Sequence, residues 1–110
     1  MKLEAEMYVR TKWGGFFKLN YYDEKEKRWI CVGKYNWSPI YESEVKKASH
    51  NIIDLIEVGD YVNGRKVIKN CLEDGGNIIL FENGFCATNK DIKSIVTKEE
   101  FESISYKMGD

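Results

Sequence analysis

Short apolar segments separated by polar turns run along most of the chain. In the clearest stretch, residues 51–67, an apolar segment from Ile52 to Ile56 precedes the turn dipeptides Gly59-Asp60 and Asn63-Gly64. The valines and the tyrosine around these turns are β-branched or aromatic residues, which favour strands. Because the apolar segment is too short for an ordinary helix, the stretch predicts at most one helical turn, followed by the tight turns and short strands of a small β-barrel.

The first half of the chain predicts a series of hairpins. A strand from Met7 to Arg10 turns at Gly14-Gly15 and returns as residues 16–22, because glycine adopts the positive φ of a tight hairpin without strain. Residues 28–32 form the next expected strand. Residues 34–48 are expected to contain a long loop, although residues 44–48 fit a strand or a helix, of which we favour the strand.

The second half shows the same alternation of strands and turns. The expected strands cover residues 66–72, 77–81, 85–88 and 92–96, with turns at 74–76 and 83–84. Thr97 and Glu100 have the spacing of a capping box, which predicts a short helix that continues through Ser103. Residues 105–108 are expected to add a final edge strand.

Together these elements predict a mostly β (or α+β) fold, namely a small antiparallel SH3-like barrel or roll with one or two short helices. The length of 110 residues fits a single domain that covers residues 1–110. The sequence itself contains no internal repeat and no clear domain boundary.

Charge and hydropathy narrow the expected partners. The net charge is −1, so no general field attracts nucleic acid or an anionic membrane, and neither is an expected partner. The segment from Met1 to Glu6 lacks the apolar core of a signal peptide, and no apolar run approaches the ~20 residues that span a membrane. The sequence therefore predicts a soluble protein of the cytoplasm.

Few residues suggest catalysis or metal binding. His50 is the single histidine, and the three cysteines, Cys31, Cys71 and Cys86, form no C-x-x-C pair. Each cysteine has apolar neighbours, so we expect three reduced and largely buried thiols. The carboxylate clusters fall on expected turns or on a solvated helix face. We therefore expect no enzyme activity, no metal site and no cofactor.

Aromatic residues crowd the segment between Trp13 and Tyr41, where basic residues interrupt them. A small core needs only some of these rings, so several are expected at the surface; packing of them all into the core is the alternative. Exposed rings beside Arg or Lys can stack on a base and pair with phosphate, or act as hot spots against a protein. The candidate binding residues are Arg10, Trp13, Arg28, Trp29, Lys34, Tyr35 and Trp37.

Two C-terminal motifs carry a resemblance to known sequences. Residues 51–64, Asn-Ile-Ile-Asp-Leu-Ile-Glu-Val-Gly-Asp-Tyr-Val-Asn-Gly, and residues 91–103, Asp-Ile-Lys-Ser-Ile-Val-Thr-Lys-Glu-Glu-Phe-Glu-Ser, resemble a group of small uncharacterised proteins from phages and prophages of low-GC Gram-positive bacteria. The group offers no catalytic residues to carry over. What the resemblance implies is a context, since small accessory phage proteins often act against host defences and bind and block rather than catalyse.

Two functions of different classes follow from these observations. The preferred one is sequestration of a nucleotide-type immune signal of the host by a homo-oligomer. The alternative is an anti-CRISPR-like module that binds and inhibits a host defence enzyme, and a purely structural or interaction protein of the phage is a further alternative. An enzyme that cleaves the signal has the least support, because the sequence shows no histidine pair, metal cluster or activated nucleophile.

Overall fold

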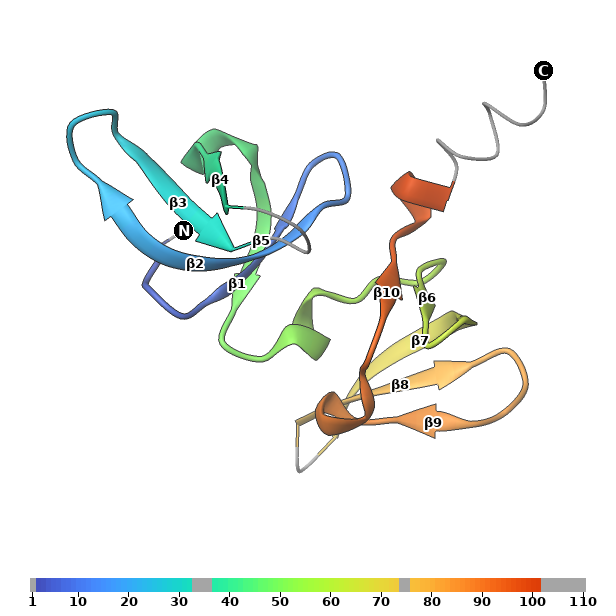
Figure 1. Ribbon diagram of the computed structural model, residues 1–110. Helices are drawn as coiled ribbons and strands as arrows, with labels where there is room; N and C mark the ends of the chain where they lie inside the picture. The colour runs from blue at the N-terminus through green and yellow to red at the C-terminus, as the bar shows by residue number, and fades with distance from the viewer. Residues whose placement is uncertain (1, 33–36, 74–75, 102–110) are drawn as a thin grey trace, which may run out of the picture. The chain divides into compact units, whose positions relative to one another are not determined.

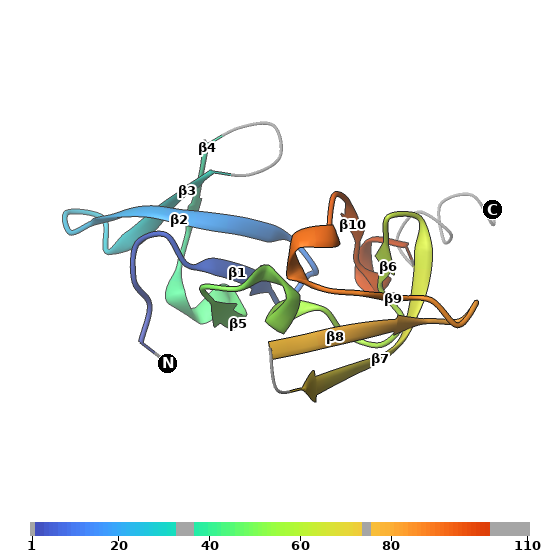
Figure 2. The same ribbon diagram turned by 90° about the horizontal axis from the view of Figure 1, so that it is seen from below.

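The computed structural model describes residues 2–32, 37–73 and 76–101, and the chain divides into two compact units, Met1–Leu55 and Ile56–Asp110. We call them unit 1 and unit 2. Each contains a five-stranded antiparallel sheet and short helical turns (Figure 1, Figure 2). The mostly β expectation is thus confirmed, whereas the expectation of a single domain over residues 1–110 stays a prediction.

The sheet of unit 1 has the strand order β4-β3-β2-β1-β5, so its first and last strands lie side by side. Two 3₁₀ helices flank the last strand, because η1 joins β4 to β5 and η2 follows β5. The bounds are β1 Tyr8–Thr11, β2 Phe16–Asp23, β3 Arg28–Val32, β4 Trp37–Ile40, η1 Glu42–Glu44, β5 Val45–Ser49 and η2 Ile52–Leu55.

The long strand β2 takes part in two pairings. Its residues 16–18 pair with β1 and its residues 18–23 pair with β3. Between Leu19 and Tyr21 the register shifts, which inserts an extra residue into β2. A bulge of this kind bends a strand and increases its twist, so β2 can belong to both halves of a curved sheet.

One residue from each strand builds the core of unit 1. These five buried residues are Val9, Leu19, Cys31, Ile40 and Val45. Because successive side chains of a strand point to opposite faces of the sheet, these residues define the inner face of unit 1.

Unit 2 has the same topology as unit 1. Its strand order is β10-β6-β7-β8-β9, again with the first and last strands side by side, and the 3₁₀ helix η3 joins its last two strands. Its long strand β7 also carries a register shift, between Val67 and Lys69. The bounds are β6 Tyr61–Val62, β7 Arg65–Glu73, β8 Gly76–Phe81, β9 Cys86–Ala87, η3 Asn89–Asp91 and β10 Ile95–Val96.

The core of unit 2 likewise takes residues from successive strands. The buried side chains are Val62, Val67, Ile79, Phe81 and Ala87. A repeat that the sequence does not display is therefore present in the topology, since the two units share strand order and bulge position but not residues.

The 3₁₀ helix before the last strand is capped in the same way in both units. In unit 1 the backbone N–H of Tyr41 donates to Glu44 Oε1 at 3.0 Å, and in unit 2 that of Thr88 donates to Asp91 Oδ2 at 2.9 Å. In each case a carboxylate three residues along the chain satisfies an amide that the helix cannot. The shared sequence signal is only an acidic residue three positions after the cap.

The expectation of a long loop at residues 34–48 is wrong from residue 37 onward. From residue 37 onward this segment contains β4, η1 and most of β5, while residues 33–36 lie outside the described residues. Pro39 fits in β4 because β4 is an edge strand, where a missing N–H costs no ladder bond. The strand that we favoured for residues 44–48 is confirmed as β5.

The expected C-terminal helix begins where it was predicted, whereas the expected closed barrel does not form among the described strands. Helical residues do begin after Thr97, at residues 98–101, but the rest of that helix and the expected strand at 105–108 lie outside the described residues. Within the described part of the chain, neither sheet closes into a barrel, because β4 and β5, and likewise β9 and β10, do not pair with each other.

Candidate functional site

The outer face of β2, β3 and β4 in unit 1 is apolar and exposed. Strand pairing places two rows of side chains across it, Tyr21–Ile30–Pro39 and Lys18–Val32–Trp37. These residues alternate with the buried Leu19, Cys31 and Ile40, so they point away from the core. We call Tyr21, Ile30, Val32, Trp37 and Pro39 the aromatic face.

Two of the largest side chains of the aromatic face are more than half exposed. Trp37 has 61% of its surface accessible and Tyr21 has 54%. Residues directly opposite each other on neighbouring strands have Cβ atoms ~5 Å apart, so the rows form one continuous patch. Contiguous exposed apolar patches mark interaction sites more often than scattered apolar residues do.

The basic residues nearest to the aromatic face are engaged by acids of unit 1. Lys18 Nζ lies 3.1 Å from Glu6 Oε2, and the hydrogen bond to Glu6 raises the pKa of Lys18. Arg28 Nε lies 3.9 Å from Asp23 Oδ2. Both positive charges therefore already have a negative neighbour.

Trp13 is an exposed ring held in place by the β1–β2 hairpin. The ring is 54% exposed and packs edge-on against Phe17, with centroids 5.6 Å apart. A Cβ on Gly15 would lie only 2.4 Å from the Trp13 ring, so the indole covers this glycine. The hairpin is further tied by the Gly15 N–H, which donates to Thr11 Oγ1 at 2.8 Å.

The remaining candidate residues do not join this surface. Arg10 is fully buried, donates from Nη1 to the Leu55 carbonyl at 3.0 Å and lies over the ring of Phe16. Trp29 packs against the core of unit 1. Lys34 and Tyr35 lie outside the described residues. Of the seven candidates, Trp37 lies on the aromatic face, and Arg28 lies beside it.

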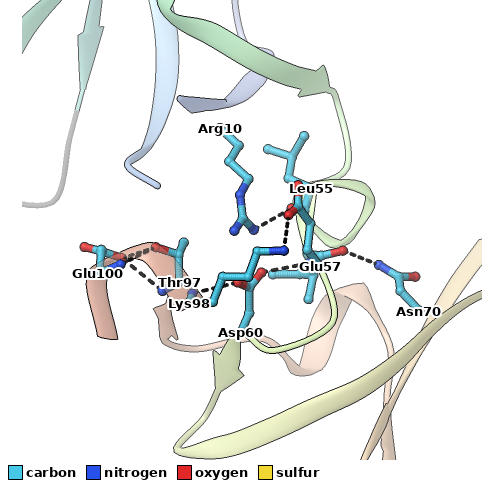
Figure 3. A network of polar contacts seen from close by, with 9 residues as sticks. Arg10, Leu55, Glu57, Asp60, Asn70, Thr97, Lys98 and Glu100 are labelled. Carbon is cyan, nitrogen blue, oxygen red and sulfur yellow. Dashed lines mark hydrogen bonds and ion pairs between the residues drawn. The ribbon is translucent and has the colours of Figure 1, made fainter. Parts of the chain in front are cut away.

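The motif at residues 51–64 has a structural role in the segment that opens unit 2 (Figure 3). The buried Asp60 carboxylate accepts the Glu57 N–H at 2.7 Å and the Lys98 N–H at 2.9 Å. Lys98 Nζ also lies 2.8 Å from Glu57 Oε1. Gly59 adopts the positive φ (99°) that its turn dipeptide predicted.

The second motif, at residues 91–103, also builds structure where it is described. The Thr97 N–H donates to Glu100 Oε1 at 3.0 Å and the Glu100 N–H donates to Thr97 Oγ1 at 3.2 Å, which confirms the expected capping box. Asn63 joins the two motifs, because its Oδ1 accepts the Lys93 N–H at 2.8 Å. The motif residues described in unit 2 thus maintain the fold of that unit, and no residue of either motif belongs to the aromatic face.

The expectation of three buried thiols is wrong for Cys86. Cys31 is buried, and burial raises its pKa to about 11, but Cys71 is only partly buried and Cys86 is exposed. Cys86 pairs with Leu80 on the outer row of β8 and β9, whereas the neighbouring Ala87 pairs with the buried Ile79. Apolar sequence neighbours therefore do not predict which face of an edge strand a thiol occupies.

Two further findings on the described residues concern metal sites and membrane-spanning helices. No group of three or more His, Cys, Asp or Glu side chains that could hold a metal ion occurs in the described ranges, and His50 is exposed with Nε2 3.8 Å from Glu4 Oε2. Among the same residues, no helix is long and apolar enough to cross a membrane.

No protein-family model, no curated protein and no solved structure matches the chain. The functional assignment therefore depends on the surfaces of the two units.

Proposed function

We propose that the chain is a small binding protein, without a catalytic site of its own, that docks on a partner protein through the aromatic face of unit 1. The observation that carries the proposal is the continuous outer patch around Trp37 and Tyr21, both more than half exposed. Large aromatic side chains supply most of the energy of protein interfaces because they bury much apolar area with little loss of side-chain entropy.

We further propose that each unit is an SH3-like roll. Three features support this reading in both units: the fifth strand lies beside the first, the long second strand carries a bulge, and a 3₁₀ helix precedes the last strand. This architecture leaves the outer face of the second to fourth strands open, which is where the aromatic face lies.

A protein partner fits the charges better than the nucleotide that the sequence led us to prefer. A nucleotide needs cations that are available for phosphate. Arg10 is buried with its guanidinium bound to a backbone carbonyl, and Arg28 has Asp23 beside it. The aromatic face itself presents apolar surface rather than charge.

The resemblance to phage and prophage proteins supplies the context of this proposal. In that context the partner is a host defence protein in the cytoplasm of the infected cell, and binding blocks one of its working surfaces. If the chain instead has a structural role within the phage, the same face binds a phage protein in place of the host protein.

Sequestration of a nucleotide-type signal is the second candidate function. The exposed indole rings of Trp13 and Trp37 favour it, because any base can stack on an exposed aromatic ring. Titration with ADP-ribose-type ligands and cyclic dinucleotides should then quench tryptophan emission in a saturable way, and the bound form should be a homo-oligomer. If none of these ligands quenches the emission, the second candidate is wrong.

The main proposal is tested with matched variants and one purified partner. A host protein captured by the intact chain should bind Trp37→Ala and Tyr21→Ala at least about ten-fold more weakly, since an interface hot spot contributes about 2 kcal/mol or more. Leu72→Ala, which shortens an exposed apolar side chain of unit 2, is the control and should bind normally. Equal binding of all three variants, or loss only of self-association, would contradict the proposal.

A further inference from the structure

The dipeptide Asn-Gly occurs twice in the chain, at residues 63–64 and 83–84, and both copies lie in exposed turns of unit 2. An asparagine before glycine loses its side-chain amide readily, because a glycine without a Cβ lets its backbone nitrogen approach the side-chain carbonyl carbon. In a folded protein the reaction also depends on how firmly the turn holds the side chain. The two copies therefore form a matched comparison within one unit.

The side chain of Asn63 is held at both of its polar atoms. Its Nδ2 donates to the Asp91 carbonyl at 2.8 Å, and its Oδ1 accepts the N–H groups of Lys93 at 2.8 Å and Ser94 at 3.1 Å. The backbone N–H of Asn63 also donates to the Ser94 carbonyl at 3.0 Å. Asn63 can therefore turn toward the nitrogen of Gly64 only if it releases three side-chain hydrogen bonds.

The side chain of Asn83 is held much less firmly. Its Oδ1 accepts the Phe85 N–H at 3.1 Å, and its Nδ2 donates no hydrogen bond to any residue in the described part of the chain. Residues 82–86, which connect β8 to β9 and begin β9, are all exposed. A Cβ on Gly84 would meet no atom within 4 Å, so this side of the turn is open to solvent.

We infer that Asn83 is a modification site, at which the folded chain deamidates spontaneously while Asn63 is protected. The backbone nitrogen of Gly84 gives up its proton and bonds to Cγ of Asn83, the Cγ–Nδ2 bond breaks, and the amide nitrogen takes up a proton and leaves as ammonia. The product is a succinimide ring. Water then opens either C–N bond of the ring to the Gly84 nitrogen, which yields aspartate or isoaspartate without any oxidant or reductant. The site does not depend on the function proposed for unit 1.

Backbone hydrogen bonds of the turn set the rate of this reaction. The Gly84 N–H donates to the Phe81 carbonyl at 3.0 Å, and the Phe81 N–H donates to the Phe85 carbonyl at 2.8 Å. The Gly84 nitrogen can therefore attack only when the turn opens locally. Such an opening is easier than unfolding of the whole unit, because β9 is an edge strand of two residues. The folded chain should thus react more slowly than the unfolded chain, and at Asn83 first.

Deamidation changes both the charge and the geometry of the turn. The neutral amide becomes a carboxylate beside the exposed Glu82, so the net charge of −1 becomes more negative by one unit. In the isoaspartate form the main chain runs through Cγ, which inserts one more carbon between residues 83 and 84. The hydrogen bond from the Phe81 N–H across the turn should then weaken, so this amide should exchange its hydrogen faster than in Asn83→Asp, which adds the charge alone. Equal exchange in the two forms would contradict this effect on the turn.

The experiment incubates the full chain at mildly alkaline pH, where deprotonation of the Gly84 nitrogen is easier. Trypsin places the two asparagines in separate peptides, residues 48–65 and 70–90, and tandem mass spectrometry locates each amide that has become an acid. Asn83 should deamidate at least about ten-fold faster than Asn63, because two more side-chain hydrogen bonds hold Asn63 and each changes the rate by about five-fold. Ion exchange should show the acidic product.

Two controls separate the effect of the fold from that of the dipeptide. Asn83→Gln keeps an amide at this position but cyclises far more slowly, so it should melt at the same temperature and lack the early acidic product. In urea both dipeptides are released from the fold and should deamidate at similar rates. The inference is wrong if Asn83 in the folded chain reacts no faster than Asn63, if Asn83→Gln still forms the early acidic product, or if the preference for Asn83 persists in urea.

Discussion

Units 1 and 2 share a topology but differ in which side chains their strands expose to solvent. In unit 1 the outer face of the second to fourth strands presents Tyr21 and Trp37, and the neighbouring Lys18 and Arg28 lie beside carboxylates. In unit 2 the long strand presents Lys66 and Lys69, without carboxylate partners among the described residues.

The features that the two units share belong to the inner face of the sheet and to the turns. Both units bury apolar residues from their first four strands and have a bulge in the long strand and a capped 3₁₀ helix. The outer positions contribute little to packing, so they can carry rings in one unit and cations in the other. Function is therefore to be sought separately in each unit.

The largest expected effect is that of Asp60→Ala in unit 2. Its buried carboxylate accepts two backbone N–H groups, and their loss leaves buried donors without a partner, so the free energy of unfolding should fall by about 3 kcal/mol. Asp54→Ala, which removes an exposed carboxylate bound to Ser49, is the control from unit 1 and should cost less than about 1 kcal/mol. Urea unfolding measures both.

The same unfolding experiment tests whether the units behave alike. All three tryptophans, Trp13, Trp29 and Trp37, lie in unit 1, so tryptophan emission reports on that unit, while amide hydrogen exchange reports on β7 and β8. If both signals change together in Asp60→Ala, the chain unfolds as the single domain that its length predicts. Loss of protection in unit 2 alone would instead show two independent domains.

A smaller effect is expected from Gly15→Ala in unit 1. The added methyl group would collide with the rings of Trp13 and Phe17, so the variant should lose about 1–3 kcal/mol, and Trp13 emission should shift to longer wavelength as the ring is displaced. Gly59→Ala in unit 2 meets no such crowding, but its positive φ should cost roughly 1–2 kcal/mol. An unshifted emission spectrum in Gly15→Ala would contradict the packing of Trp13.

The rate of thiol labelling should differ between the two units, and the measurement destabilises neither. Cys86 in unit 2 should react rapidly with a thiol reagent in the native protein, and Cys31 in unit 1 should react only after unfolding, because it is buried and its pKa is raised to about 11. Mass spectrometry of labelled peptides identifies the site. Cys86→Ser is the control, and rapid labelling of Cys31 would contradict its place in the core.

The smallest effect concerns the capped 3₁₀ helices. Hydrogen bonds from the backbone and hydroxyl of Thr88 lower the pKa of Asp91 below its ordinary value. Since the folded pKa is below the unfolded one, the cap stabilises unit 2 above pH ~4 and loses this contribution as the pH falls through the folded pKa. Asp91→Asn should therefore reduce stability slightly at neutral pH and remove this part of the acid dependence, as NMR titration and acid unfolding can show.

The identities of the elements were largely predictable because turns and strands depend on neighbouring residues. The positive φ of Gly59, the capping box at Thr97 and the strand at residues 44–48 follow from residues only a few positions apart. The shared topology was not predictable in this way. It rests on pairings such as Val9 with Ala48 and Ile95 with Val62, which join residues far apart in the chain.

For the candidate sites, sequence alone determined which residue types were present but not which face they occupy. Arg10 and Lys66 both follow a strand pattern, yet one is buried against a backbone carbonyl and the other is exposed. Trp29 faces the core, whereas Ile30, the next residue, faces outward, because pairing with β2 and β4 decides which of the two alternating sets is covered. A strand repeats every two residues, so only its partners and bulges select the buried set.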